Sequence, residues 1–419
     1  MRFVVLYLIG AAVARLVNWF SWWLVQIQQP LAIVAAPRSA TASRHGSKNV
    51  RWSAWVPIVG AWQVRRKATS GAGPSGWRPL LLELLLGLGF AILYWWEVPN
   101  WELLRDQAPP GFAPAGSDWF VLHAQFASHL LLVTFMLAAS LVDIDEQTIP
   151  DLVTIPGTLL GFLAATIMPA SLLPVIDPAN GMLSVGFLNL ASPNEPPIHL
   201  TPNATFGWLC AAILCFWLWC LALLPWRRGG RRGWRHAVAL TTARWRRDPL
   251  SIVVVACALV GTAAIGAIWF FGGERWLGLV SSLLGMAACG GLIWAVRIAA
   301  SWALAREAMG FGDVTLMAMI GSFLGWQTSP MVFFLAPLAG LFVGLIQWFV
   351  KRNNVIPYGP FLCLAALFVI VKWGPIWTWA MPLYDLPWLV PTVIAICLVM
   401  LAIMLRGWRT LRTALGIGD

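Results

Sequence analysis

Charged side chains are scarce in this chain of 419 residues, because Asp, Glu, Lys and Arg make up 11% of it while 59% is hydrophobic. A soluble domain carries about 25% charged residues, which it needs to keep a water-facing surface. The chain also holds many uncharged stretches of the ~20 residues that a helix needs to cross a bilayer. This shortage of charge excludes a soluble protein and predicts a multi-span membrane protein.

Paired cysteines are also missing, since no CxxC motif occurs anywhere in the sequence. The isolated cysteines all fall within apolar stretches: Cys210, Cys215, Cys220, Cys257, Cys289, Cys363 and Cys397. Without paired spacing they predict neither a zinc site nor a disulfide framework, so no metal ligand set is expected. We interpret them as packing residues.

Apolar runs bounded by Pro, Gly and charged residues predict an all-α bundle of about 9–11 transmembrane helices. The predicted spans are 3–27, 79–96, 119–142, 152–170, 204–225, 249–272, 276–299, 314–328, 330–350, 358–373 and 386–405. The first run lacks a small-residue cleavage site, so it is predicted to be a retained helix rather than a signal peptide. The runs 314–328 and 358–373 are short for a full crossing.

Basic residues gather in alternate loops, and carboxylates are absent from the segment 28–78. That segment and the segment 226–248 are rich in Arg, whereas the segment 171–203 has no Lys or Arg. Cytoplasmic loops are enriched in Lys and Arg, which predicts an outward-facing amino terminus and a cytoplasmic location for both basic segments. The net charge of +11 then reflects membrane topology and a lipid bilayer partner, and no nucleic-acid partner is expected.

Carboxylates are few, and two places hold them where a predicted helix meets the cytoplasmic side. Asp143, Asp145, Glu146 and Asp151 surround the inner end of the third span. The motif Gly310-Phe-Gly312-Asp313 stands at the inner start of the eighth span. The predicted topology brings both places to the same face of the membrane, although they were not used to derive it.

Two carboxylates that share one proton provide a general acid and a general base, so such a pair can hydrolyse a peptide bond without a metal or cofactor. Gly310 and Gly312 lack side chains, which lets a substrate or a neighbouring backbone approach Asp313. Other interpretations remain open at this point. Asp151 follows Pro150 and is interpreted as a helix cap, Asp145 fits a solvated loop charge, and a lone Gly-x-Gly-Asp is a weak pattern.

The strings Asp143-Ile-Asp-Glu-Gln-Thr-Ile-Pro150-Asp151 and Gly310-Phe-Gly-Asp313 resemble those of the bacterial type IV prepilin peptidases. These membrane aspartic proteases share the Gly-x-Gly-Asp signature with presenilin-like enzymes. The stretches 78–88, 320–326 and 356–361 are similar to further parts of the family, so that the resemblance covers roughly 1–170 and 276–373.

The resemblance implies that Asp143 and Asp313 are the catalytic pair, with Asp145 as the rival for the first position. It implies an endopeptidase of the inner membrane that removes the leader from pilin-like or pseudopilin precursors on the cytoplasmic side. S-adenosylmethionine would be a cofactor only if the methylation of many relatives is retained. The segment 28–78 lacks the cysteine pairs of methylating members, which argues against it. Thr315 stands where a Lys is often found.

With this resemblance the chain divides into six predicted segments. They are the first helix (1–27), a basic Cys-less loop like the methyltransferase region (28–78), helices with the first aspartate (79–170), an insertion with a periplasmic loop, two helices and an Arg-rich loop (171–275), peptidase core helices (276–373), and an extra helix with a basic tail (374–419). A proton-coupled transporter and a non-catalytic scaffold of a pilus or secretion assembly are the alternative functions.

Polar residues inside the remaining predicted spans are interpreted by position. Arg15 and Asn18 are expected to face the bundle interior. Glu83 is interpreted as a helix-end side chain that reaches the membrane surface. His123 and His129 are interpreted as packing or hydrogen-bonded residues.

Overall fold

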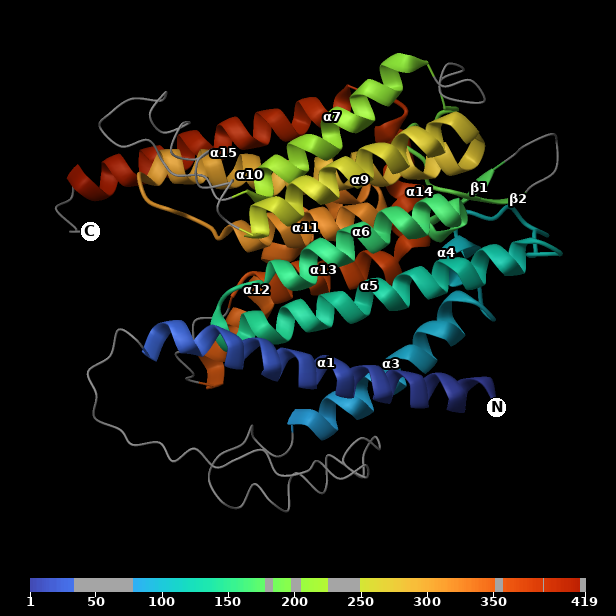
Figure 1. The fold of residues 1–419 in the computed structure, drawn as a ribbon, viewed down its shortest axis with the longest axis horizontal. Helices are drawn as coiled ribbons and strands as arrows, with labels where there is room; N and C mark the ends of the chain where they lie inside the picture. Colours follow the sequence, from blue (N-terminus) through green and yellow to red (C-terminus); the bar gives the residue numbers. More distant parts are fainter. Residues whose placement is uncertain are drawn as a thin grey trace.

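The protein is an α-helical bundle with one small β-hairpin (Figure 1). The computed structural model describes residues 1–33, 78–177, 184–196, 205–224, 249–350, 357–386 and 388–414. Its helices are α1 (Arg2–Ile33), α3 (Arg78–Glu97), α4 (Glu102–Arg105), α5 (Asp118–Glu146), α6 (Asp151–Ile167), α7 (Phe206–Leu223), α9 (Pro249–Phe271), α10 (Gly273–Leu304), α11 (Phe311–Leu324), α12 (Thr328–Val350), α13 (Gly359–Val371), α14 (Trp373–Tyr384) and α15 (Leu389–Ala414), with a 3-10 turn η3 (Pro169–Ser171).

Eight helices in the described part of the chain are long and apolar enough to cross a bilayer, which confirms the predicted multi-span membrane bundle. The pair α13 and α14 adds a ninth if it counts as one span, although its two parts meet at 91°. Helices α6 and α11 are shorter, and they coincide with the predicted spans 152–170 and 314–328. Most of the basic segments 28–78 and 226–248 lie outside the described residues.

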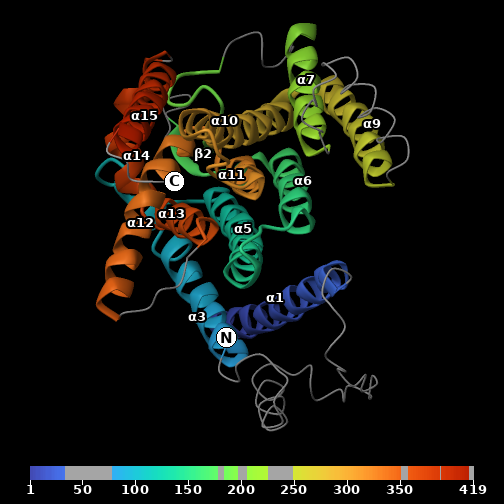
Figure 2. The same ribbon diagram turned by 90° about the vertical axis from the view of Figure 1, so that its left-hand side faces the viewer.

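Helix α11 occupies the centre of the bundle, surrounded by α5, α6, α10 and α13 (Figure 2). Every residue of α11 from Asp313 to Leu324 is buried, as expected for a helix that is apolar on all sides. The pair α1 and α3 packs on one flank of this core, and α7 and α9 lie on the opposite flank (Figure 2). Helix α15 lies at the periphery and buries none of its residues.

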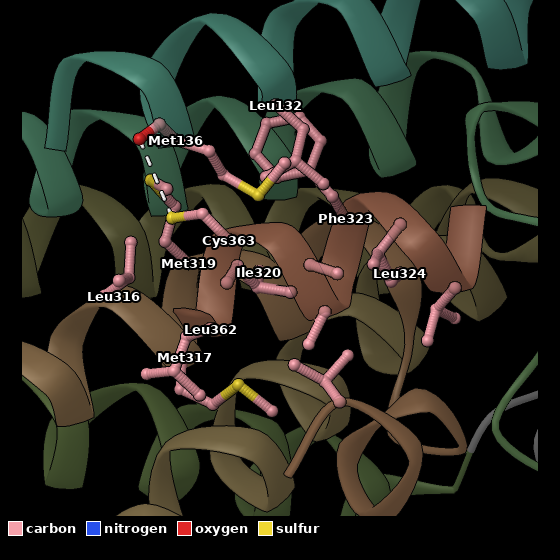
Figure 3. Close-up of a cluster of buried hydrophobic side chains, with 14 of the residues drawn as sticks. Leu132, Met136, Leu316, Met317, Met319, Ile320, Phe323, Leu324, Leu362 and Cys363 are labelled. Atoms are coloured by element: carbon pink, nitrogen blue, oxygen red, sulfur yellow. Dashed lines mark hydrogen bonds between the residues drawn. The ribbon is translucent and has the colours of Figure 1, made fainter. Parts of the chain in front are cut away.

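The core around α11 is built from side chains of α5, α11 and α13 (Figure 3). Leu132 and Met136 of α5 face Ile320 and Phe323 of α11, and the Cys363 thiol of α13 donates to the carbonyl of Met136 at 3.6 Å. Glycines allow α10 to approach closely on the other side of α11. A Cβ added at Gly285 would collide with the carbonyl oxygen of Gly321, which is the close approach that small residues permit between membrane helices.

Buried polar pairs join α3 to its neighbours. Arg15 of α1 forms an ion pair with Glu83 of α3 at 3.1 Å, and Glu83 is 1% exposed. The interpretation of Glu83 as a surface-reaching side chain is therefore wrong, whereas Arg15 faces the interior as predicted. The Glu97 carboxylate and His129 Nδ1 of α5 are hydrogen-bonded at 2.9 Å, which confirms His129 as a hydrogen-bonded residue.

The hairpin marks one end of the bundle. Strands β1 (Pro174–Asp177) and β2 (Ser184–Phe187) pair antiparallel, an addition to the all-α prediction. The backbone N–H of Val185 donates to Asp118 at the start of α5 (3.3 Å), so the hairpin lies at this end of the helix. The carboxylate-rich end of α5 is consequently at the opposite end of the bundle.

Candidate active site

Asp143 lies in the last turn of α5, and its side chain is turned inward with 4% exposure. Its Oδ2 accepts a hydrogen bond of 3.1 Å from the backbone N–H of Gly359, the first residue of α13. The first N–H groups of a helix have no partner within the helix, so this bond satisfies one of them and a buried carboxylate together. Two helices distant in the sequence therefore meet at this side chain.

Asp313 lies in the first turn of α11 and is 9% exposed. The helix begins after Gly310, whose extended backbone (φ −66°, ψ 156°) occupies the N-cap position. The chain enters this turn from α10, which ends at Leu304. A carboxylate in the first turn of a helix interacts favourably with its positive end.

The two aspartates converge on one site, as the sequence predicted for the third and eighth spans. Their carboxyl groups interact electrostatically with one another. The thiol of Cys363, one turn into α13, interacts with both of them, and the Tyr358 hydroxyl interacts with Asp313. The site is thus formed by the end of α5 and the beginnings of α11 and α13.

The glycines of the Gly310-Phe-Gly312-Asp313 motif differ in what they do. A Cβ at Gly312 would lie 2.8 Å from Cβ of Ile149 and 3.2 Å from its carbonyl oxygen, so only glycine lets this loop pack against α11. A Cβ at Gly310 would meet only ordinary contacts, the nearest at 3.8 Å from Oδ2 of Asp313. Gly312 therefore serves the close backbone approach that the sequence predicted, and Gly310 leaves open space beside the carboxylate.

Thr315 anchors the start of α11 to α6. Its hydroxyl donates to the carbonyl of Gly312 at 3.0 Å and accepts a hydrogen bond from the Thr154 hydroxyl at 3.1 Å. Both threonines are buried. The residue that departs from the resembled pattern is therefore part of a buried hydrogen-bond chain that fixes the turn containing Asp313.

The other carboxylates near the end of α5 lie away from the pair. Asp145 is directed outward and forms an ion pair with Arg78 of α3 at 2.6 Å. Glu146 and Asp151 are exposed. Asp151 is the first residue of α6, and Pro150 holds the cap position without a side-chain hydrogen bond, so the interpretation of Asp151 as a capping side chain is wrong.

The two aspartates differ in their local electrostatics. Asp143 is near the negative end of α5 and Asp313 near the positive end of α11, effects worth about 0.3–1 kcal/mol each at a helix end. A hydrogen bond to a charged group contributes about 1.5–3 kcal/mol, and Asp143 receives one from Gly359. The positive end of α13 also faces Asp143 and opposes the field of α5. The direct hydrogen bond is consequently the larger of these influences.

Gly359, Tyr358 and Cys363 belong to the site but were not predicted as site residues. The only sequence signal was the similarity of the stretch 356–361 to a late loop of the resembled family. Cys363 was interpreted as a packing residue, and its contact with Met136 agrees with that role. Its position one turn after Gly359 is visible only once α13 is placed against α5.

An apolar cavity of about 220 Å³ lies beside the first two turns of α11, next to the turn that contains Asp313. It is lined by Phe311, Val314 and Thr315 of α11 and by residues of α7 and α10, including Trp219 and Gly290. Among the described residues, no group of three or more His, Cys, Asp or Glu side chains is arranged to hold a metal ion. The site therefore combines two buried carboxylates with apolar surroundings.

Part of the chain is similar in sequence to one known protein family. Residues 245–345 match the sequence model of the type IV leader peptidase family. This segment includes Asp313 and begins within the predicted insertion 171–275, whereas Asp143 precedes it.

Individual relatives give the same result over a limited length. The prepilin leader peptidase/N-methyltransferase of Pseudomonas putida is 31% identical over 113 residues, and that of Aeromonas hydrophila is 33% identical over 113 residues, each match covering 24% of this chain and 39% of the relative. The protein of that name from Escherichia coli (strain K12) is 30% identical over 105 residues, 22% of this chain and 47% of the relative. The chain thus matches less than half the length of these relatives. No solved structure matches it.

Proposed function

We propose, from the similarity of residues 245–345 to the type IV leader peptidase family and from the relatives matched, that this chain is a membrane-embedded aspartic endopeptidase. Its catalytic groups are Asp143 and Asp313. The observation that carries the proposal is the meeting of these two buried carboxylates, from the end of α5 and the start of α11, at one end of the bundle. The multi-pass helical fold supplies the apolar environment in which such a pair interacts strongly.

The proposed reaction uses one ionised and one protonated carboxyl group. The ionised carboxylate removes a proton from a water molecule as the water oxygen bonds to the scissile carbonyl carbon, and the protonated carboxyl donates its proton to the carbonyl oxygen. The tetrahedral intermediate then breaks its C–N bond, and the proton taken from water passes from the first aspartate to the leaving nitrogen. As the new carbonyl forms, a hydroxyl of the intermediate returns its proton to the second aspartate. This cycle returns both aspartates to a state that shares one proton.

The proposed substrates are precursors of pilin-like or pseudopilin proteins, and the proposed product is the protein without its leader. The relatives matched are named prepilin leader peptidases, which supports this substrate class. We place the site on the cytoplasmic face of the inner membrane, because the topology predicted from the sequence puts the basic segments 28–78 and 226–248 on the same side of the membrane as both aspartates.

Methyl transfer to the new amino terminus is left out of the proposed activity. The relatives' names include N-methyltransferase, an activity that uses S-adenosylmethionine as the methyl donor. The segment 28–78 of this chain has no cysteine, so a Cys-ligated zinc site cannot form there. We therefore propose proteolysis without methylation as the principal activity.

The test is to incubate the purified chain in detergent with a pilin-like precursor from the same genome and to follow both products by mass spectrometry. We expect the wild type to release the leader and Asp313→Asn to release none, with both proteins equally folded. Addition of S-adenosylmethionine should leave the mass of the new amino terminus unchanged. A wild type that never cleaves would contradict the proposed function and would favour a scaffold or a transporter, and a gain of one methyl group would show that methylation is retained.

A further inference from the structure

The start of α13 contributes to the site in a way that neither aspartate motif contains. The Gly359 N–H belongs to the first turn of α13, and its hydrogen bond of 3.1 Å to Asp143 Oδ2 joins residues 216 positions apart. Gly359 itself is buried, so water does not compete for this bond. The contact exists because α13 begins beside α5 at the level of Asp143.

Only glycine fits at this position. A Cβ added to residue 359 would collide with Oδ2 of Asp143 and would lie 3.0 Å from Cδ1 of Ile149. Ile149 is held in the loop that packs against Gly312, so the Asp143 carboxylate is the group that would have to move. Any side chain at 359 would therefore push the carboxylate away from the amide that binds it.

Asp313 has different surroundings. In the part of the chain that the structure describes, no hydrogen bond to its carboxyl group is found, and its neighbours are Asp143 and the Tyr358 hydroxyl. A hydrogen bond from an N–H to a carboxylate favours the ionised form of that carboxylate. Of the two aspartates, Asp143 is the one that receives such a bond.

We propose that Gly359 is a positioning residue of the active site, whose amide holds Asp143 as the ionised partner, so that Asp143 is the general base and Asp313 carries the proton. This inference rests on the proposed peptidase function. It extends that function by assigning the two roles and by adding α13 to the machinery. The titratable groups that face the pair in the described structure are Tyr358 and Cys363, which are neutral at physiological pH. Arg78 is directed to Asp145 on the outer side of the turn.

The test compares Gly359→Ala with Gly340→Ala in the cleavage assay, measuring kcat and KM as a function of pH. The control adds a methyl group on α12 that meets Phe361 of α13 at 3.4 Å, an ordinary contact away from Asp143. For Gly359→Ala we expect kcat to fall by at least ~10-fold with KM within ~2-fold, because the change affects the transition state more than binding. Its acid limb should move to higher pH, since Asp143 loses the donor that favours ionisation.

A second variant keeps the test valid if Gly359→Ala does not fold. Pro360→Ala leaves the amide in place but loosens the start of α13, because Pro fixes the backbone in the first turn of a helix. It should shift the acid limb in the same direction by a smaller amount. If the wild type cleaves and neither variant moves the acid limb, the proposed role of Gly359 is wrong while the peptidase function stands. If the wild type does not cleave, the proposed function itself is wrong.

Discussion

At the scale of single residues, the site depends on where side chains are missing as much as on the two carboxylates. Gly312 lets the backbone of Ile149 pack against α11, and Gly359 lets its own N–H reach Asp143. Ile149 contacts both positions, so the loop between α5 and α6 is held between the two glycines. A methyl group at either glycine would therefore disturb the geometry of an aspartate.

Gly312→Val tests this requirement on the side of Asp313. The valine Cβ would stand 2.8 Å from Cβ of Ile149, and overpacking of this kind costs about 1–3 kcal/mol. A small displacement of a catalytic group lowers the rate by about 100-fold, which is the loss we expect in the initial rate of leader cleavage. Gly89→Ala is the control, because a Cβ there meets nothing within 4 Å. Equal rates for the two variants would show that Gly312 has no such role.

At the scale of elements, buried polar pairs hold α1, α3 and α5 together on one flank. Glu97 of α3 is hydrogen-bonded to His129 of α5, and the side chains are 2% and 0% exposed. Glu97 Oε2 and His129 Nε2 have no partner among the described residues. The pair therefore depends on its single mutual bond for compensation of its burial.

Glu97→Ala should lower the free energy of unfolding by about 1–2 kcal/mol, because it leaves a buried imidazole without its partner between two membrane helices. The free energy can be measured by unfolding in mixed micelles with increasing denaturing detergent. Glu102→Ala is the matched control, because Glu102 forms an ion pair at 2.8 Å with Arg105, whose side chain is 66% exposed. Surface ion pairs of this kind contribute about 0–1 kcal/mol. A loss no larger than that of the control would contradict the structural role of the pair.

At the scale of the whole molecule, the helical bundle could be predicted because apolar length alone decides which segments cross a membrane. The short run 314–328 was also predicted as a helix, yet its central position follows from packing that no local pattern encodes. The bend of 91° between α13 and α14 and the hairpin β1–β2 depend on contacts between distant segments. For the same reason Glu83 was predicted to reach the membrane surface, although it forms a buried ion pair with Arg15.

The candidate site was predictable in its aspartates and not in its supporting residues. Asp143 and Asp313 stand out because carboxylates are rare beside apolar helices, and their convergence followed from the order of the spans. Gly359 could not be identified, because a glycine before an apolar helix carries no sign of the carboxylate that it meets. Asp145 could not be separated from Asp143 until its ion pair with Arg78 showed that it is directed outward.

The choice of Asp143 over Asp145 is the central claim, because Asp143 lies outside the segment 245–345 that matches the family. The most direct test is the single-turnover rate of leader cleavage by Asp143→Asn compared with Asp145→Asn, with both proteins shown to be folded in detergent. We predict that Asp143→Asn lowers the rate by at least ~1000-fold, as expected on loss of general base catalysis and nucleophile activation. Asp145→Asn should stay within ~10-fold, because it removes only a half-exposed ion pair. A large loss of rate in Asp145→Asn, with Asp143→Asn still active, would contradict the account.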